Sequence, residues 1–236
     1  MAHMRAETDR TIPEMLVDRA LLLTLYVQAA RTGSVGDKLK AQKLAFLAAY
    51  PLFVKRIKAF NLEFYRYDLG PISTAIYENW SVYDELGLLP LKGNEFGAPS
   101  KIASELVDDF VAEVLARPKN RLVRDRIAKV ALEFGRATTG AILDHVYGLK
   151  AATIEDPSKR PIREIPKYEH FTRVLDEGEA AAIMVVDSPW IDTLAVELIP
   201  ENSRAIDRAV ADLRAGRVFR GTGNGEVERD AATGLY

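Results

Sequence analysis

The positions of apolar residues along the chain predict a mainly α-helical protein. Between Met15 and Ala30 they lie on nearly every side of the expected helix, which is typical of a central helix surrounded by its neighbours. A second helix begins after Asp37, a residue type that caps helix N-termini, and keeps one apolar face as far as about Ala59. We expect these two helices to form an antiparallel hairpin at the centre of the fold.

The same helical spacing continues through most of the chain. Ser100 and either Thr138 or Thr139 are expected N-caps, and Ser188-Pro189 is a favourable helix start. The further helices are expected over residues 72–83, 100–116, 119–134, 138–147, 168–182, 190–198 and 205–215.

Two short stretches break the helical spacing. Leu62 to Tyr67 alternates and is rich in aromatic side chains, so it predicts a short strand. Gly70-Pro71 then marks a turn, because glycine allows a positive φ and proline at a helix start leaves no N–H unpaired. A small β-ribbon is expected over residues 88–96, where a Lys-Gly-Asn turn separates apolar residues.

The chain divides into four predicted parts. Helical spacing fails between Ala151 and Lys167, where three prolines occur among charged residues, and this predicts an extended connector. The last segment is rich in glycine and poor in apolar residues, which predicts a flexible tail. We therefore expect a helical domain with a small β-ribbon at 13–150, the connector at 151–167, a helical extension at 168–215 and the tail at 216–236.

Composition narrows the class of protein. The 236 residues are 48% hydrophobic and 28% charged, which are ordinary values for a globular protein. A net charge of -2 argues against a protein devoted to coating nucleic acid, since phosphate neutralisation supplies most of that affinity. No apolar run approaches the roughly 20 residues that span a bilayer, and the absence of cysteine is compatible with a reducing compartment. We predict a cytoplasmic protein without a membrane partner.

Candidate catalytic chemistry is sparse. His145 lies in an expected helix with no second histidine at metal-ligand spacing, and His170 also stands alone. The run Gly221–Gly225 superficially suggests a phosphate loop, but such a loop needs a strand before it and a helix after it, so a flexible linker is the better interpretation. We predict no enzyme, no metal site and no cofactor.

Three pieces of the sequence resemble, in order and spacing, the Panacea family of SocA-like antitoxins. Residues 37–47 resemble the family's leucine-rich opening helix, typically "LQKLLYL", and residues 64–73 resemble its aromatic segment ending in "YGP(V/I)". Ile76-Tyr77 and residues 86–89 resemble the next helix and its exit, while Asp68-Leu69 stands where the family commonly has an aromatic residue. The resemblance implies an antitoxin that inhibits a cognate protein toxin by direct contact and is usually encoded beside it.

Candidate partner-binding residues fall into three groups. Tyrosines are suited to an interface because a few aromatic anchors carry most of the affinity. Arg117, Arg121 and Arg124 lie at i, i+4 and i+7 on one helix face, which is a solvated face, a DNA contact or a patch for an acidic toxin. The tail adds apolar anchors that order only against another surface. The candidates are Tyr65, Tyr67, Asp68, Tyr77, Tyr83, Arg117, Arg121, Arg124, Phe219 and Tyr236.

Two other functions remain open at this point. The order of two helices and a ribbon also suits winged-helix proteins, so a transcriptional regulator that binds its own promoter DNA is the first alternative. An adaptor that presents a partner to a protease is the second, with the tail as the handle.

Overall fold

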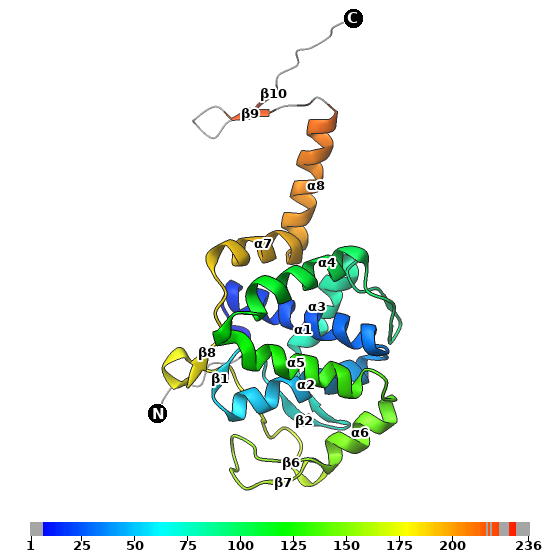
Figure 1. Ribbon diagram of the computed structural model, residues 1–236, viewed down its shortest axis with the longest axis vertical. Coiled ribbons are helices and arrows are strands. Elements are labelled where there is room, and N and C mark those ends of the chain that lie inside the picture. Colours follow the sequence, from blue (N-terminus) through cyan, green and yellow to red (C-terminus); the bar gives the residue numbers. More distant parts are fainter. Residues whose placement is uncertain (1–6, 216, 218, 222–226, 230–236) are drawn as a thin grey trace, which may run out of the picture.

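The computed structural model describes residues 7–215, 217, 219–221 and 227–229, and it confirms a mainly α fold with small two-stranded ribbons and C-terminal helices (Figure 1). The α-helices described are α1 (Ile12–Thr32), α2 (Lys38–Val54), α3 (Ala75–Glu85), α4 (Lys101–Phe110), α5 (Arg121–Phe134), α6 (Thr139–Gly148), α7 (Ser188–Leu198) and α8 (Pro200–Arg214). The strands are β1 (Ile57–Lys58), β2 (Tyr65–Tyr67), β3 (Gly70–Ile72), β4 (Leu91–Lys92), β5 (Glu95–Phe96), β6 (Lys150–Ala151), β7 (Arg160–Pro161), β8 (Ala182–Ile183), β9 (Phe219–Gly221) and β10 (Val227–Arg229). Short helical turns are η1 (Glu7–Asp9), η2 (Val111–Leu115), η3 (Pro118–Asn120), η4 (Ile162–Glu164) and η5 (Glu177–Glu179).

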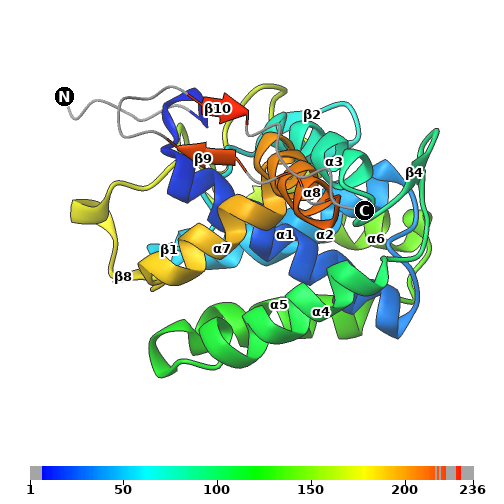
Figure 2. The ribbon, with the colours of Figure 1, turned by 90° about the horizontal axis from the view of Figure 1, so that it is seen from above.

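The central helix is α1, as its all-round apolar character predicted. Helices α2, α4, α5 and α7 pack around it (Figures 1 and 2), and Leu21, Leu25 and Tyr26 are fully buried. A capping box fixes its start: Thr11 Oγ1 accepts the N–H of Glu14 at 3.3 Å, and the Glu14 carboxylate accepts the N–H of Thr11 at 2.8 Å. Two of the donors that a helix start leaves free are thereby satisfied.

Helix α2 begins where predicted and ends earlier. Asp37 Oδ1 accepts the N–H of Lys40 at 2.7 Å, which confirms the expected cap. Beyond Val54 the predicted helix is wrong, because Arg56 turns the chain with a φ of 57° and β1 then pairs in parallel with β8. The strand partner lies far along the chain, so local helical spacing carries no signal of it.

The segment 168–182 is not the helix that its spacing predicts. It runs largely extended beside β2 and β1, and its helical content is the turn η5. The N–H of Tyr168 donates to the carbonyl of Arg66 at 2.7 Å, and that of Phe171 to the carbonyl of Phe64 at 2.7 Å. These long-range bonds satisfy backbone groups that a helix would otherwise pair locally, so tertiary pairing overrides a weak local preference.

Both sides of the predicted boundary near residue 150 contribute to one hydrophobic core. Ile162 and Phe171 are buried in the same cluster as the side chains of α1, and so are Leu194 and Leu198 of α7. The stretch 151–167 is held to the body, since β6 pairs with β7 and η4 contacts α6. The division into an antitoxin domain and an extension stays a prediction.

Helix α8 begins at Pro200, earlier than predicted, because proline suits a first helical turn. It projects from the body of the protein (Figure 1). In the predicted tail, β9 and β10 form an antiparallel pair. Within the described residues, each helix is too short or too polar to cross a membrane.

Candidate partner-binding surfaces

Three tyrosines from two distant segments meet in what we call the tyrosine surface: Tyr65, Tyr67 and Tyr168. Alternate side chains of a strand point to opposite faces, so Tyr65 and Tyr67 share one face of β2 while Arg66 turns inward. Tyr168 joins them because its N–H donates to the carbonyl of Arg66. An isolated bridge between Tyr65 and His170 continues the pairing.

The three rings support one another and remain accessible. The ring centres of Tyr65 and Tyr168 are 6.5 Å apart, those of Tyr67 and Tyr168 6.1 Å, and those of Tyr65 and Tyr67 6.4 Å. Tyr67 is 40% exposed and Tyr168 is 62% exposed. Aromatic rings held by each other lose little freedom when a partner covers them, so this surface is preorganised for binding.

Tyr168 occupies an unusual backbone conformation. Its φ is 70°, in the left-handed region that bulky residues rarely adopt. The neighbouring Lys167 forms an ion pair with Asp68, one of the predicted binding residues, and this contact raises the pKa of Lys167. The sequence gives no local signal that residues 167–170 join β2, so Tyr168 and His170 were not among the predicted binding residues.

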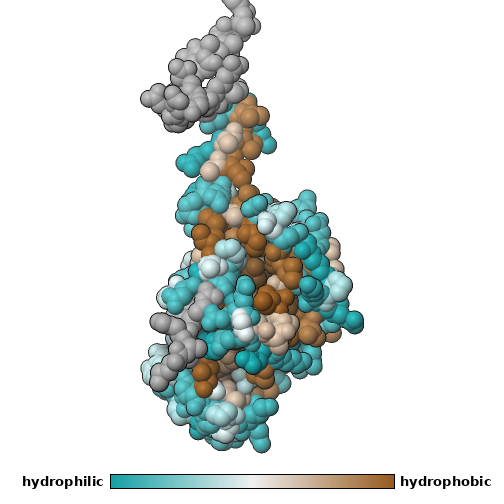
Figure 3. Space-filling view, turned by 90° about the vertical axis from the view of Figure 1, so that its left-hand side faces the viewer, coloured by the Kyte–Doolittle hydropathy of each residue, from teal (hydrophilic) through white to brown (hydrophobic). Residues whose placement is uncertain are grey.

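A second surface is the apolar stripe of α8, formed by Ile206, Val210 and Leu213. These residues lie at i, i+4 and i+7 and are 43%, 41% and 73% exposed. Figure 3 shows apolar residues along one side of the projecting helix. An ion pair between Arg204 and Glu85 of α3 holds the first turns of α8, and beyond Arg204 every residue of the helix except Asp212 is exposed. Helix α8 is therefore amphipathic, and its apolar face is of the kind that docks in a partner's groove.

Arg117, Arg121 and Arg124, here called the basic cluster, do not lie on one helical face as predicted. Arg117 precedes α5 and has an extended backbone, because Pro118 disfavours a helical conformation in the residue before it. Its guanidinium pairs with Asp187 at 3.1 Å. Arg121 and Arg124 both pair with Asp125, at 3.5 and 2.9 Å. Intramolecular acids thus neutralise part of the cluster.

The remaining predicted residues are scattered. Tyr77 on α3 is 44% exposed, and its ring packs on Trp80 at 4.9 Å. The prediction that Tyr83 binds a partner is wrong, because Tyr83 is fully buried and its hydroxyl donates to the carbonyl of Arg19 at 2.7 Å. Phe219 belongs to β9, but its side chain lies outside the described residues, as does the whole of Tyr236.

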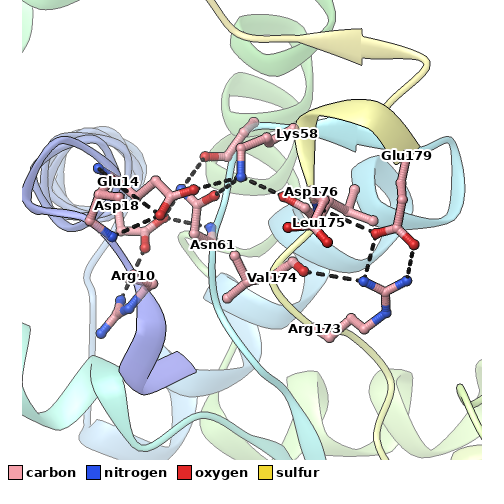
Figure 4. Close-up of polar contacts among 12 residues, drawn as sticks. Arg10, Glu14, Asp18, Lys58, Asn61, Arg173, Val174, Leu175, Asp176 and Glu179 are labelled. Atoms are coloured by element: carbon pink, nitrogen blue, oxygen red, sulfur yellow. Dashed lines mark hydrogen bonds and ion pairs between the residues drawn. The ribbon is translucent and has the colours of Figure 1, made fainter. Parts of the chain in front are cut away.

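A cleft of about 570 Å³ opens where the start of α1 faces β1, β8 and α7. A polar network forms part of its floor (Figure 4): Lys58 Nζ donates to Glu14 at 2.7 Å, to Asn61 at 3.1 Å and to the carbonyl of Leu175 at 2.5 Å. Asp18 accepts the N–H of Asn61 at 2.7 Å. All three donors of the Lys58 ammonium are used, so we assign the network to structure.

Asp18 is the most perturbed group of this network. Complete burial raises its pKa to about 7, against the opposing effect of Arg10, whose guanidinium lies 3.0 Å away. The contact joins the segment before α1 to the helix itself.

His145 and His170, the histidines that the structure describes, are engaged in a ring contact and a hydrogen bond. The ring of His145 lies 4.7 Å from that of Phe134, and His170 Nδ1 lies 2.9 Å from Glu155. In the part of the chain that the structure describes, no group of His, Asp or Glu side chains is arranged to hold a metal ion.

Comparison with known proteins gives no relative: no family model matches the chain, and neither a curated protein nor a solved structure matches it.

Proposed function

We propose that this protein is a cytoplasmic antitoxin that neutralises a cognate protein toxin by binding it. The observation that carries the proposal is the tyrosine surface, where Tyr67 and Tyr168 are 40% and 62% exposed. Tyrosine is enriched among the residues that dominate interface energies, because it buries a large area and keeps a polar tip. Such a surface suits a stable protein partner.

The backbone conformation of Tyr168 supports the same conclusion. A non-glycine residue at a φ of 70° costs free energy, and such conformations cluster at functional sites. Here the conformation places the ring against Tyr65 and Tyr67 and leaves most of it accessible. The partner would then gain a rigid aromatic anchor, with the ion pair of Asp68 and Lys167 at its edge.

The α8 stripe offers this partner a second contact. Its apolar residues lie on the projecting helix, away from the tyrosine surface (Figure 1). A toxin that contacts both surfaces would therefore be bound from two sides. If α8 is instead a handle for an adaptor that delivers its partner to a protease, truncation after Ala215 would leave the partner bound but stable in cells. Neutralisation by binding requires no degradation.

A DNA-binding regulator is the less supported alternative. Arg121 and Arg124 share Asp125 as a counter-ion, and Arg117 is paired with Asp187. Arg126 donates from Nε to the carbonyl of Leu47 at 2.8 Å. A regulator would show binding to its own promoter that weakens steeply with salt, because each phosphate contact releases counter-ions.

Co-expression with the product of the adjacent open reading frame tests the proposal. We expect the neighbour to be toxic alone, harmless with this chain, and co-purified with it. The double variant Tyr67→Ala, Tyr168→Ala should weaken the complex at least about 30-fold, the loss of a hot spot of about 2 kcal/mol. The matched control is Tyr77→Ala, which removes a tyrosine of similar exposure whose ring packs on Trp80.

Two results would contradict the proposal. One is a neighbour that is innocuous and does not co-purify, in which case promoter binding becomes the leading function. The other is a complex that the double variant and Tyr77→Ala weaken equally, which would move the binding site away from the tyrosine surface.

A further inference from the structure

Lys43 on α2 and Arg66 on β2 are buried cations that have no carboxylate partner among the described residues. Lys43 is 0% exposed and Arg66 is 9% exposed. The Nζ of Lys43 donates to the carbonyl of Pro71 at 2.8 Å, and the Nε of Arg66 to that of Ile162 at 3.2 Å. Neutral carbonyl oxygens offset only part of the cost of burying a charge.

Two other buried cations are paired with carboxylates, whereas Lys40 also donates to backbone carbonyls. Lys58 has the Glu14 carboxylate at 2.7 Å, and Arg10 has that of Asp18 at 3.0 Å. Lys43 instead has a second cation as its charged neighbour. Burial first, and then repulsion from Arg66, lower the pKa of Lys43 to about 7. Lys43 and Arg66 are thus two neighbouring buried cations without an acidic counter-ion among the described residues.

Arg66 also leaves a donor unused. Its Nη1 is buried and has no hydrogen-bond partner. Its guanidinium lies 5.8 Å from the centre of the Tyr147 ring, on α6. Buried polar atoms in native proteins nearly always have a partner, and an unbound ion is one of the few explanations for an exception.

Gly70 lies beside Lys43 and Tyr147, two of these groups. It has a φ of 90°, and a Cβ added there would lie 3.6 Å from Lys43 Nζ and 3.7 Å from the Cε1 atom of Tyr147. The Tyr147 hydroxyl donates to the carbonyl of Asp68 at 3.3 Å, which fixes α6 over the turn between β2 and β3. Lys43 from the opening-helix motif and Gly70-Pro71 from the turn motif thus meet at one point.

We propose that Lys43 and Arg66 form a binding site for a small oxyanion of the phosphate or sulfate class. Two cations match the charge of a dianion, whose oxygens would accept from Lys43 Nζ and from the unused Nη1 of Arg66. A planar guanidinium and a compact ammonium are the two donor types that proteins use for such ions. Arg66 faces inward, opposite to Tyr65 and Tyr67, so the site is separate from the tyrosine surface and independent of the proposed antitoxin function.

Titration of the full chain with inorganic phosphate and with sulfate, at ionic strength held constant with chloride, tests this site. Calorimetry should give saturable binding of one anion per chain, and thermal unfolding should move to higher temperature. Lys43→Met should weaken binding at least tenfold while remaining folded, because it removes a buried charge and keeps the shape of the side chain. Arg66→Lys, which keeps the charge but loses the guanidinium fork, should weaken binding as well.

Lys40→Met is the matched control. Lys40 is also a buried lysine on α2, with its Nζ bonded to the carbonyls of Ser34 and Gly135 at 2.9 Å each. The proposal is overturned if the wild-type protein shows no saturable binding of either anion. It is equally overturned if Lys43→Met and Lys40→Met bind the anions alike, since a general salt effect acts on both.

Discussion

The side-chain amide of Asn120 pairs with the backbone of Val185 as a neighbouring strand would. Asn120 Oδ1 accepts the N–H of Val185 at 2.8 Å, and its Nδ2 donates to the carbonyl of Val185 at 2.8 Å. The same Nδ2 donates to the carbonyl of Val114 at 2.9 Å. One buried side chain therefore joins the turn before α5 to the segment that follows β8.

Asn120→Ala should lower the free energy of unfolding by about 2–3 kcal/mol, because it leaves backbone groups of Val185 and Val114 without partners. Urea unfolding measures the change. Asn94→Ala, in the exposed turn between β4 and β5, is the control and should change stability by less than about 0.5 kcal/mol. Equal effects of the two substitutions would show that the Asn120 bonds add nothing.

Close approach of α1 and α5 gives a second prediction. A Cβ added at Gly135 would lie 2.0 Å from Thr32 Oγ1 and 2.9 Å from the carbonyl oxygen of Ala29. Gly135→Ala should destabilise the protein by about 2–4 kcal/mol, since overpacking forces backbone shifts. Gly148→Ala, which meets no atom within 4 Å, should be neutral or stabilising by up to about 1 kcal/mol. If thermal unfolding shows that Gly135 and Gly148 both tolerate alanine, the packing argument is wrong.

Local patterns predicted most of the helices, although residues 168–182 are not a helix and α8 begins earlier than expected. The caps predicted at Asp37, at Ser100 and at either Thr138 or Thr139 are present, the last of them at Thr138, with side-chain oxygens that accept backbone N–H groups at 2.7, 3.1 and 3.2 Å. Capping and helical spacing depend on residues within one or two turns, and these are visible in the sequence.

Long-range relationships were not visible in the same way. Tyr168 reaches Tyr65 through backbone pairing between segments about a hundred residues apart, and no local spacing encodes that pairing. Tyr83 is buried with Ile76 and Trp80 on one stripe of α3, and its position on that stripe, rather than its aromatic ring, decides where it lies. The proposed oxyanion site combines Lys43 and Arg66, which are far apart in the sequence, so no local pattern predicts it.

The buried carboxyl of Asp18 predicts a specific pH dependence. Its pKa rises from 3.8 to about 7 on folding, so between these values the folded state binds more protons than the unfolded state. Its contribution to stability is therefore present at low pH and is lost as the pH rises through about 7, by on the order of 4 kcal/mol at most. The difference in unfolding free energy between wild type and Asp18→Asn should fall across that range.

Asp192→Asn, which changes an exposed carboxylate on α7, is the control for Asp18 and should leave the slope unchanged. A wild-type minus Asp18→Asn difference that stays flat from about pH 4 to pH 7 would mean that Arg10 keeps Asp18 charged throughout.

Backbone strain and partner binding can be separated at Tyr168. Glycine adopts a φ of 70° without a steric penalty, whereas alanine keeps the β-carbon that causes it. Tyr168→Gly should therefore be more stable to urea than Tyr168→Ala by about 1 kcal/mol, although both lose the ring. At an ordinary negative φ the order would be reversed, so the sign of the difference reports the strain directly. Both variants should bind the toxin at least tenfold more weakly than wild type, since the ring supplies the contact and the backbone only aims it. A complex that tolerates both substitutions would leave the strain without a role in binding.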